Sequence, residues 1–184
     1  ENQPLLRTHT CGQLRAEHID QRVTLCGWVD TYRDHSGVLF VDLRDRYGKT
    51  QVVFAVDGGD ETLKQAKVLR SEYVISVTGD VARRPECTIN PKLPTGEIEL
   101  RVRHLEILNP SNTPPFQPTA KELPGEDLRL KHRYIDLRRP EMQRTMLLRH
   151  RVISIMRRYF DEHGFVDVET PMLGRSTPEG ARDY

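Results

Sequence analysis

Hydrophobic and polar positions alternate over much of the first hundred residues, which is the pattern of half-buried β-strands. β-branched and aromatic side chains recur with a period of two, so each stretch would present one apolar and one polar face. The alternation is interrupted between the stretches, most clearly at the glycine-containing break 57–59 and at the loop 84–96, which contains three prolines. The predicted strands are residues 23–32, 38–44, 50–56, 73–81 and 98–108.

The connections between these stretches indicate how the strands are joined. Residues 45–48, which end in glycine, are typical of a hairpin between the second and third strands. A short helix is predicted at 61–70, after a break at 57–59. Three strands, a small helix and two strands are the order of an OB-fold, a five-stranded Greek-key barrel that commonly binds oligonucleotides. Another small β-barrel would show the same pattern.

The periodicity changes after the fifth strand. Residues 110–124 contain five prolines and no periodicity, so they are predicted to be a linker. Apolar positions then return at helical spacing over 141–163, with Pro140 suited to the first turn and Gly164 to the C-terminal cap.

A further strand is predicted at 165–171, ended by Pro171 because proline cannot donate to a ladder. The predicted fold class is therefore mainly β with an α+β extension. The predicted domains are an OB-fold barrel (1–109), a linker or hinge (110–139) and the first helix and strand of a second domain (140–184).

Charge is balanced overall but not locally. The formal net charge of +1 argues against a uniformly basic nucleic-acid-binding coat. Residues 129–158, however, contain ten Lys or Arg against only Asp136 and Glu141. This run is either a solvated helix face or a stripe that faces phosphates.

Three cysteines, Cys11, Cys26 and Cys87, are an odd number without CxxC spacing. This pattern argues against a disulfide framework or a zinc site and favours a reducing compartment. The first ten residues contain no apolar signal core, and no apolar run approaches membrane length. We therefore expect a cytoplasmic protein without a metal site.

The second strand carries the best candidate site that the pattern alone provides. If its apolar alternation fills the core, Phe40 and Asp42 point outward. A hairpin that pairs Leu43 with Thr50 would place Gln51 on the same face, opposite Asp42 and diagonal to Phe40. An exposed ring beside an amide suits single-stranded bases, with stacking worth roughly 1–3 kcal/mol per base. Alternatively, the N-terminal segment or the second domain covers Phe40.

Several stretches resemble the class II aminoacyl-tRNA synthetases, and more closely the bacterial-type aspartyl-tRNA synthetases. Thr170-Pro171 at the predicted strand end is similar to motif 1 of the class, and TPEGARDY (177–184) resembles the loop of the aspartyl branch that closes over the amino acid. The other similar stretches are HTCGQLRAEHIDQRVTLCGWV (9–29), VLFVDLRD (38–45), TGEIEL (95–100) and RLKHRYIDLRRPEM (129–142). The resemblance covers almost the whole chain, and lysyl and asparaginyl relatives share part of it.

The resemblance implies roles for residues of the barrel. Phe40 would stack on the middle anticodon base, and Gln51 would form a hydrogen bond to it. Arg33, Arg84 and Glu99 would contact anticodon bases or their phosphates. Without the resemblance, the two arginines would be taken for ordinary solvated side chains.

It also implies roles for two residues outside this group. Glu179 would lie in the mobile loop and face the α-amino group of L-aspartate. His35 stands in the turn where strict bacterial members commonly have leucine and relaxed members have histidine. It therefore points to the use of both tRNA(Asp) and tRNA(Asn), although a turn histidine is more often simply exposed.

We interpret the chain as the N-terminal portion, ending just after motif 1, of an aspartate–tRNA ligase that uses ATP and Mg²⁺. Motifs 2 and 3, which supply phosphate-binding arginines in this class, do not occur in the 184 residues, and no Walker loop replaces them. The chain alone should therefore contain no catalytic residue, bind no cofactor and be inactive. Motif 1 implies a homodimer, and the expected partner is tRNA(Asp), joined by tRNA(Asn) if specificity is relaxed.

Two alternatives remain open at this stage. One is a non-catalytic OB-fold module that binds single strands or tRNA, and the other is a lysyl- or asparaginyl-tRNA ligase. The sequence beyond Tyr184 would distinguish the first, and a panel of amino-acid substrates the second.

Overall fold

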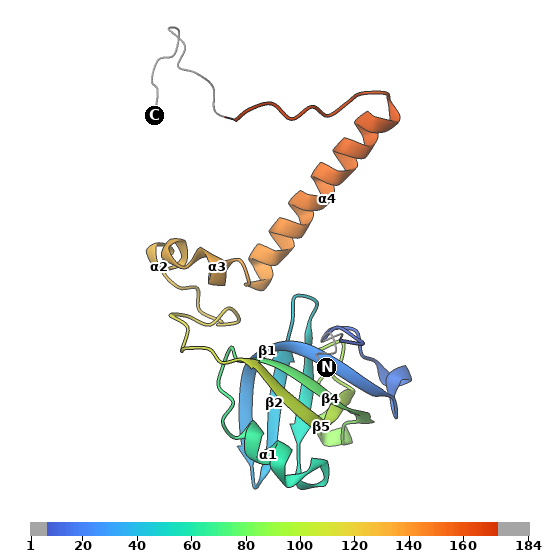
Figure 1. Cartoon of the computed structure of the whole chain (residues 1–184), viewed down its shortest axis with the longest axis vertical. Helices are drawn as coiled ribbons and strands as arrows, with labels where there is room; N and C mark the ends of the chain where they lie inside the picture. The colour runs from blue at the N-terminus through green and yellow to red at the C-terminus, as the bar shows by residue number, and fades with distance from the viewer. Residues whose placement is uncertain (1–6, 173–184) are drawn as a thin grey trace, which may run out of the picture. The chain divides into compact units, whose positions relative to one another are not determined.

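The computed structural model describes residues 7–172 of the 184-residue chain. The chain divides into two compact units, residues 1–139 and 140–184. The first unit is built around a closed five-stranded barrel (Figure 1). Its strands are β1 (Arg22–His35), β2 (Val38–Arg44), β3 (Lys49–Phe54), β4 (Val74–Arg83) and β5 (Ile98–Asn109).

The barrel closes in the strand order β1-β2-β3-β5-β4. β3 and β5 run parallel, and the other neighbouring strands are antiparallel. The short helix α1 (Asp60–Ala66) lies between β3 and β4 in the chain. This arrangement is that of an OB-fold, so the prediction from strand order is confirmed. The helix ends four residues before the predicted position, at Ala66 rather than at residue 70.

Alternation along β2 works as predicted. Leu39, Val41 and Leu43 are at most 2% exposed and fill the barrel interior, whereas Phe40 and Asp42 are only partly buried. Apolar side chains from all five strands join them in one core. Burying a side chain of this kind contributes about 1.5–3 kcal/mol, which holds the strand faces in their register.

The segment between the barrel and the second unit contains two helices that the sequence pattern missed. They are α2 (Glu126–Lys131) and α3 (Arg133–Asp136). The carboxylate of Asp136 is fully buried and accepts hydrogen bonds from Arg133 (2.5 Å) and Arg139 (3.3 Å), while Arg129 lies 3.9 Å away. Three arginines of the predicted basic stripe therefore stabilise the segment itself.

A second buried carboxylate, Asp30, connects this segment to the barrel. Its Oδ1 accepts hydrogen bonds from Arg44 Nε (3.1 Å) and Thr119 Oγ1 (2.7 Å), and its Oδ2 accepts one from Lys49 Nζ (2.5 Å). Burial by itself would raise the pKa of Asp30. The hydrogen bonds from Lys49 and Thr119, with the charges of Lys49 and Arg44, outweigh burial and hold this pKa below its ordinary value.

Asp30→Asn should lower the free energy of unfolding at pH 7 by about 3–5 kcal/mol, as is typical when one partner of a buried ion pair is removed. The folded-state pKa of Asp30 lies below the unfolded value of about 3.9. Its stabilisation is therefore present above that value and is lost as the pH falls through the folded pKa. In urea titrations, the difference between wild type and variant should be constant from about pH 7 to 5 and shrink below about pH 4. An equal difference at low and neutral pH would contradict a role for the charge.

The second unit consists of one long helix and the residues after it. Helix α4 (Pro140–Glu162) begins at Pro140, and Gly164 follows its end with a φ of 78°, as the cap prediction required. The apolar stripe is present, but in the part of the chain that the structure describes it is open. Leu148 and Ile155 are each 64% exposed.

The predicted strand at 165–171 is wrong for this structure. Residues 165–170 have no regular secondary structure, and Val166 and Val168 are 83% and 70% exposed. A strand requires a partner for its ladder hydrogen bonds. The described residues of the second unit contain no other strand that could pair with it.

None of the helices among the described residues is long and apolar enough to span a lipid bilayer. No three His, Cys, Asp or Glu residues among them are grouped so that they could hold a metal ion. The three cysteines are free: Cys11 is buried, and burial raises the pKa of its thiol, whereas Cys87 is exposed.

Candidate nucleic-acid interface

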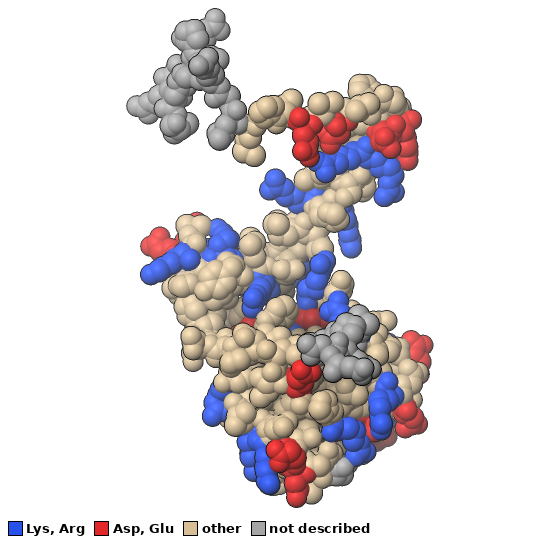
Figure 2. Space-filling view, viewed as in Figure 1, with Lys and Arg blue, Asp and Glu red and all other residues tan. Residues whose placement is uncertain are grey.

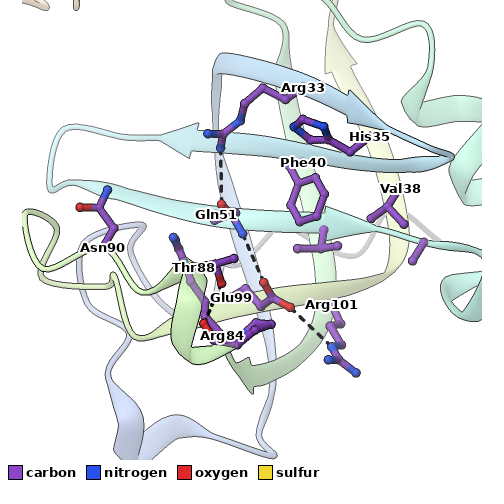
Figure 3. A pocket seen from close by; sticks show the side chains of 13 residues that line it. Arg33, His35, Val38, Phe40, Gln51, Arg84, Thr88, Asn90, Glu99 and Arg101 are labelled. Atoms are coloured by element: carbon purple, nitrogen blue, oxygen red, sulfur yellow. Dashed lines mark hydrogen bonds and ion pairs between the residues drawn. The ribbon is translucent and has the colours of Figure 1, made fainter.

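A cleft of about 610 Å³ opens on the outer face of the barrel (Figure 3). The end of β1, the outward faces of β2, β3 and β5, and the loop between β4 and β5 contribute to it. All six barrel residues singled out in the sequence line this one cleft, although they are far apart in the chain. They are Arg33, His35, Phe40, Gln51, Arg84 and Glu99.

The register of the β2–β3 hairpin explains how Phe40 and Gln51 reach the cleft. Leu43 pairs with Thr50, which is the register that the sequence argument assumed, so Gln51 lies directly opposite Asp42. Phe40 is only partly buried, and its ring packs in a T-shaped arrangement with that of His35, with the two ring centroids 5.9 Å apart. Figure 3 shows the Phe40 ring beside His35 in the wall of the cleft. The ring therefore keeps surface available for a ligand.

A chain of polar contacts fixes the amide of Gln51. Arg33 Nη2 donates to Asp42 Oδ1 (3.1 Å) and to Gln51 Oε1 (3.4 Å). Gln51 Nε2 in turn donates to Glu99 Oε2 (3.2 Å), and Arg101 Nε lies 3.7 Å from Glu99 Oε1. An amide group has two donors and two acceptor positions. Gln51 therefore retains a donor and an acceptor for the edge of a base while its orientation is held on both sides.

Arg84 is the most unusual group in the cleft. Its side chain is buried, with the residue only 5% exposed, so it is not a solvated arginine. Nε donates to the carbonyl of Ile98 (2.8 Å), but the buried Nη2 has no hydrogen-bond partner in the described structure. Burial lowers the pKa of Arg84, and the charges of Glu99 and Asp42 oppose this shift. A guanidinium nevertheless stays protonated in proteins, so Nη2 is a donor without an acceptor.

An unsatisfied buried donor costs about 1–3 kcal/mol. An oxygen or ring nitrogen of a ligand in the cleft would remove that cost. The cleft thus combines a ring that can stack, an amide with free polar positions and a guanidinium that needs an acceptor. These are the groups with which proteins bind unstacked bases and the backbone of single strands.

Sequence reasoning missed several residues of the cleft. Arg101 could have been found, because it lies two positions after Glu99 and so shares its strand face. The β4–β5 loop gave no periodic signal that would place its side chains. The missed lining residues are Val53, Ala55, Pro85, Thr88, Asn90 and Arg101; the cleft also includes Val38, which alternates with Phe40 and so shares its outward face.

Of the remaining two candidate residues, the structure describes His35 and not Glu179. His35 is the last residue of β1, is exposed and pairs with Val38 across the turn. Ser36 and Gly37 form that turn with φ values of 52° and 89°. Glu179 lies outside the described residues.

The charge over the barrel is mixed. Figure 2 shows Lys and Arg side chains interspersed with Asp and Glu on the face in view. The described surface there carries no uniform basic coat, in agreement with the net charge of +1.

Comparison with known protein families gives two matches, one after the other along the chain. Residues 23–108 match the family described as OB-fold nucleic acid binding domain. Residues 125–184 match the family described as tRNA synthetases class II (D, K and N).

Similar individual proteins agree with these matches. The aspartate–tRNA(Asp/Asn) ligase of Rhodopirellula baltica is 60% identical over 98% of this chain and 31% of its own length, and that of Halothermothrix orenii is 56% identical over 98% and 30%. The chain thus spans about 30% of the length of these relatives. Among solved structures, asparaginyl-tRNA synthetase from Pyrococcus horikoshii, complexed with asparaginyl-adenylate, superposes with a TM-score of 0.77 at 26% identity, covering 94% of this chain and 38% of that one.

Proposed function

Because the chain belongs to the class II tRNA synthetases of the aspartate, lysine and asparagine group, we propose that its barrel binds the anticodon of a tRNA in the cleft that contains Phe40. The observation that carries this proposal is the juxtaposition of three groups. The open Phe40 ring, the oriented amide of Gln51 and the Arg84 side chain line one cleft of an OB-fold, and the buried Nη2 of Arg84 has no hydrogen-bond partner in the described structure.

Each of these groups has a separate role in the proposal. Phe40 stacks on the middle anticodon base, and Gln51 reads an edge of that base through its remaining donor and acceptor. Arg84 supplies a charged donor to a base or phosphate oxygen. Arg33 and Glu99 hold the Gln51 amide from its two ends and also border the bound strand.

The chain would supply anticodon recognition to an aspartate–tRNA ligase and contribute the beginning of its catalytic domain. In the parent reaction, aspartate attacks the α-phosphate of ATP, and the aspartyl group then passes to the terminal ribose of the tRNA. Mg²⁺ would stabilise the negative charge that develops on the phosphates. A homodimer formed through motif 1, with the open stripe of α4 at the interface, and a cytoplasmic location belong to the same proposal.

The relatives weigh against the two alternatives. Residues 125–184 match a synthetase family, which disfavours an independent single-strand-binding module. The relatives of 56% and 60% identity are ligases for aspartate, which disfavours a lysyl or asparaginyl enzyme.

Binding of an anticodon hairpin tests the proposal directly. We expect the 184-residue chain to bind an RNA hairpin of about 17 nucleotides, with one stem and a seven-membered loop that carries the aspartate anticodon GUC. Fluorescence anisotropy of the labelled hairpin measures this binding. Affinity should fall steeply with salt concentration, because phosphate contacts release counterions. A hairpin with the middle uracil replaced by adenine should bind more weakly, since Gln51 would meet a different base edge. Equal binding of both hairpins would contradict base recognition in the cleft.

Relaxed specificity is a separate part of the proposal and concerns His35. The GUC and GUU anticodons of the aspartate and asparagine tRNAs differ only in the last base, and His35 lies at the edge of the cleft. The named relatives are ligases for tRNA(Asp/Asn). We expect hairpins with GUC and GUU to bind with affinities within about threefold of each other, a difference of well under 1 kcal/mol. A preference of tenfold or more for GUC would remove this part of the proposal.

A further inference from the structure

We propose that residues 110–139 are a fixed extension of the barrel, held in place by an ionic latch in which the partly exposed Arg138 joins the buried group of Asp30, Arg44 and Glu72. The sequence pattern predicted a linker or hinge here. The contacts of this segment with the strands instead indicate a positioning device. The inference concerns the first unit alone, and it does not depend on RNA binding.

The latch consists of linked carboxylates and guanidinium groups. Arg44 donates from Nε to Asp30 (3.1 Å) and from Nη2 to Glu72 Oε1 (2.5 Å). Arg138 Nη1 lies 3.6 Å from the other oxygen of Glu72, Oε2, which is buried and has no hydrogen-bond partner. Asp30, Arg44 and Glu72 are between 5% and 6% exposed. Breaking a pair of this kind is expensive because it leaves a charge buried without its partner.

Trp28 brings the two arginines together. The guanidinium carbon of Arg138 lies 4.8 Å from the centroid of the Trp28 ring, and that of Arg44 lies 5.6 Å from it. Cation–π contacts at this distance add to the attraction, and tryptophan is the best ring for them. Trp28 and Arg44 belong to the barrel, whereas Arg138 belongs to the segment, so the ring joins the two parts.

Other contacts dock the beginning of the segment on the same part of the barrel. Thr119 Oγ1 donates to Asp30 Oδ1 (2.7 Å), and Ser71 Oγ donates to Gln117 Oε1 (3.1 Å). Phe116 is 8% exposed. The segment is thus held near its start and near its end, which a freely moving linker would not be.

The backbone at Glu72 is a second sign of a specific role. Its φ of 65° lies in the left-handed region, which a non-glycine residue occupies at a cost of order 1 kcal/mol. Backbone hydrogen bonds fix it there: Glu72 N donates to Val29 O (2.7 Å), and Val29 N donates to Tyr73 O (2.9 Å). Glycine would avoid the cost, but only a side chain with a carboxylate can join Arg44 to Arg138.

The latch and the cleft use the same pair of strands, β2 and β3. Phe40, Asp42 and Arg44 alternate along β2 and so share its outer face. Arg44 pairs with Lys49 across the hairpin, just as Asp42 pairs with Gln51. The same strand pair therefore carries the proposed anticodon contacts at one end and the latch at the other. The latch fixes the segment at a defined distance from the bases that the cleft would hold.

Hydrogen exchange of the 184-residue chain tests the latch. The principal variant is the double substitution Thr119→Val and Arg138→Met, because both residues lie on the segment and their loss leaves the barrel strands unchanged. Hydrogen-bonded amides within α2 and at the end of α3, such as those of Arg129 and Leu137, report on the segment. We expect their exchange to accelerate at least about tenfold, while amides of β1 and β4 change less than about twofold. Unchanged exchange in α2 and α3 would overturn the proposal.

Two further variants make the result specific. Glu72→Gln keeps the size of the side chain but removes the charge that Arg44 and Arg138 share, and it should accelerate the same amides. Equal acceleration throughout the barrel would show that Glu72 stabilises the whole unit, and it would also overturn the latch. Arg22→Met is the matched control, since it breaks an exposed pair with Asp80 (2.9 Å), and it should leave α2 and α3 unchanged.

Hairpin binding separates this inference from the proposed function. The Thr119→Val and Arg138→Met variant keeps every residue of the cleft, so its affinity for the GUC hairpin should stay within about twofold of the wild-type value. If wild type itself does not bind the hairpin, the proposed function fails while the exchange data still decide the latch.

Discussion

Phe40→Ala should weaken binding of the aspartate anticodon hairpin by about five- to 150-fold, which corresponds to the roughly 1–3 kcal/mol that stacking on an aromatic side chain contributes per base. The ring lies in the cleft and not in the barrel core, which Leu39 and Val41 fill on the opposite face of the same strand. The melting temperature should therefore change little. Fluorescence anisotropy and thermal unfolding of the same samples measure both quantities.

Two control variants make this prediction specific. Phe40→Leu keeps an apolar side chain of similar bulk but removes the aromatic face, so it should lose most of the affinity that Phe40→Ala loses. Tyr32→Ala removes an exposed aromatic ring on the neighbouring strand β1. Tyr32 does not line the cleft, so this variant should leave affinity unchanged. A large fall in the melting temperature of Phe40→Ala, or unaltered affinity, would mean that the ring is structural.

The sequence was sufficient where a feature depends on residues close together in the chain. Alternation along β2 predicted that Leu39, Val41 and Leu43 are buried, and the hairpin has the register that was assumed for it, with Leu43 paired to Thr50. From these two expectations, the common face of Phe40 and Gln51 followed. Strand order and the intervening helix were enough to predict the OB-fold.

Features that depend on distant partners could not be predicted in the same way. Helices α2 and α3 lack the apolar periodicity that would predict them. Ionic contacts between arginines and the buried Asp136 help to stabilise them instead. The burial of Arg84 depends on the loop before β5, where Arg84 N donates to Glu97 O (2.9 Å). The strand predicted at 165–171 failed for the same reason, since period-two alternation marks a strand but does not provide its partner.

Arg84 illustrates how such a distant contact changes the functional argument. The sequence alone could not distinguish a solvated arginine from one that binds a ligand. In the structure the side chain is buried, one of its nitrogens donates to Ile98 O, and another has no acceptor. A buried charge with an unused donor is costly to maintain. We infer that the fold accepts this cost because the bound strand provides the missing acceptor.

Arg84→Met should therefore weaken hairpin binding by about ten- to 150-fold, the equivalent of the roughly 1.5–3 kcal/mol that a hydrogen bond to a charged group contributes. The substitution also removes the donor that the carbonyl of Ile98 uses. The melting temperature should therefore fall by a few degrees (about 4–8 °C per kcal/mol in a small domain). Arg84→Lys keeps the charge but not the fork of donors, so its affinity should lie between those of wild type and Arg84→Met.

Arg33→Met is the matched control for the loss of a guanidinium from the same cleft. The Arg33 side chain is 49% exposed and already paired with Asp42 (3.1 Å), so its removal should cost less affinity than that of Arg84. Salt dependence then identifies the acceptor. If Arg84 contacts a phosphate, the slope of log affinity against log salt should decrease by about one in Arg84→Met, whereas contact with a base leaves the slope unchanged and reduces discrimination between hairpins. Affinity that is equal in wild type and Arg84→Met would show that no bound strand provides the acceptor, and that the unpaired nitrogen has no part in RNA binding.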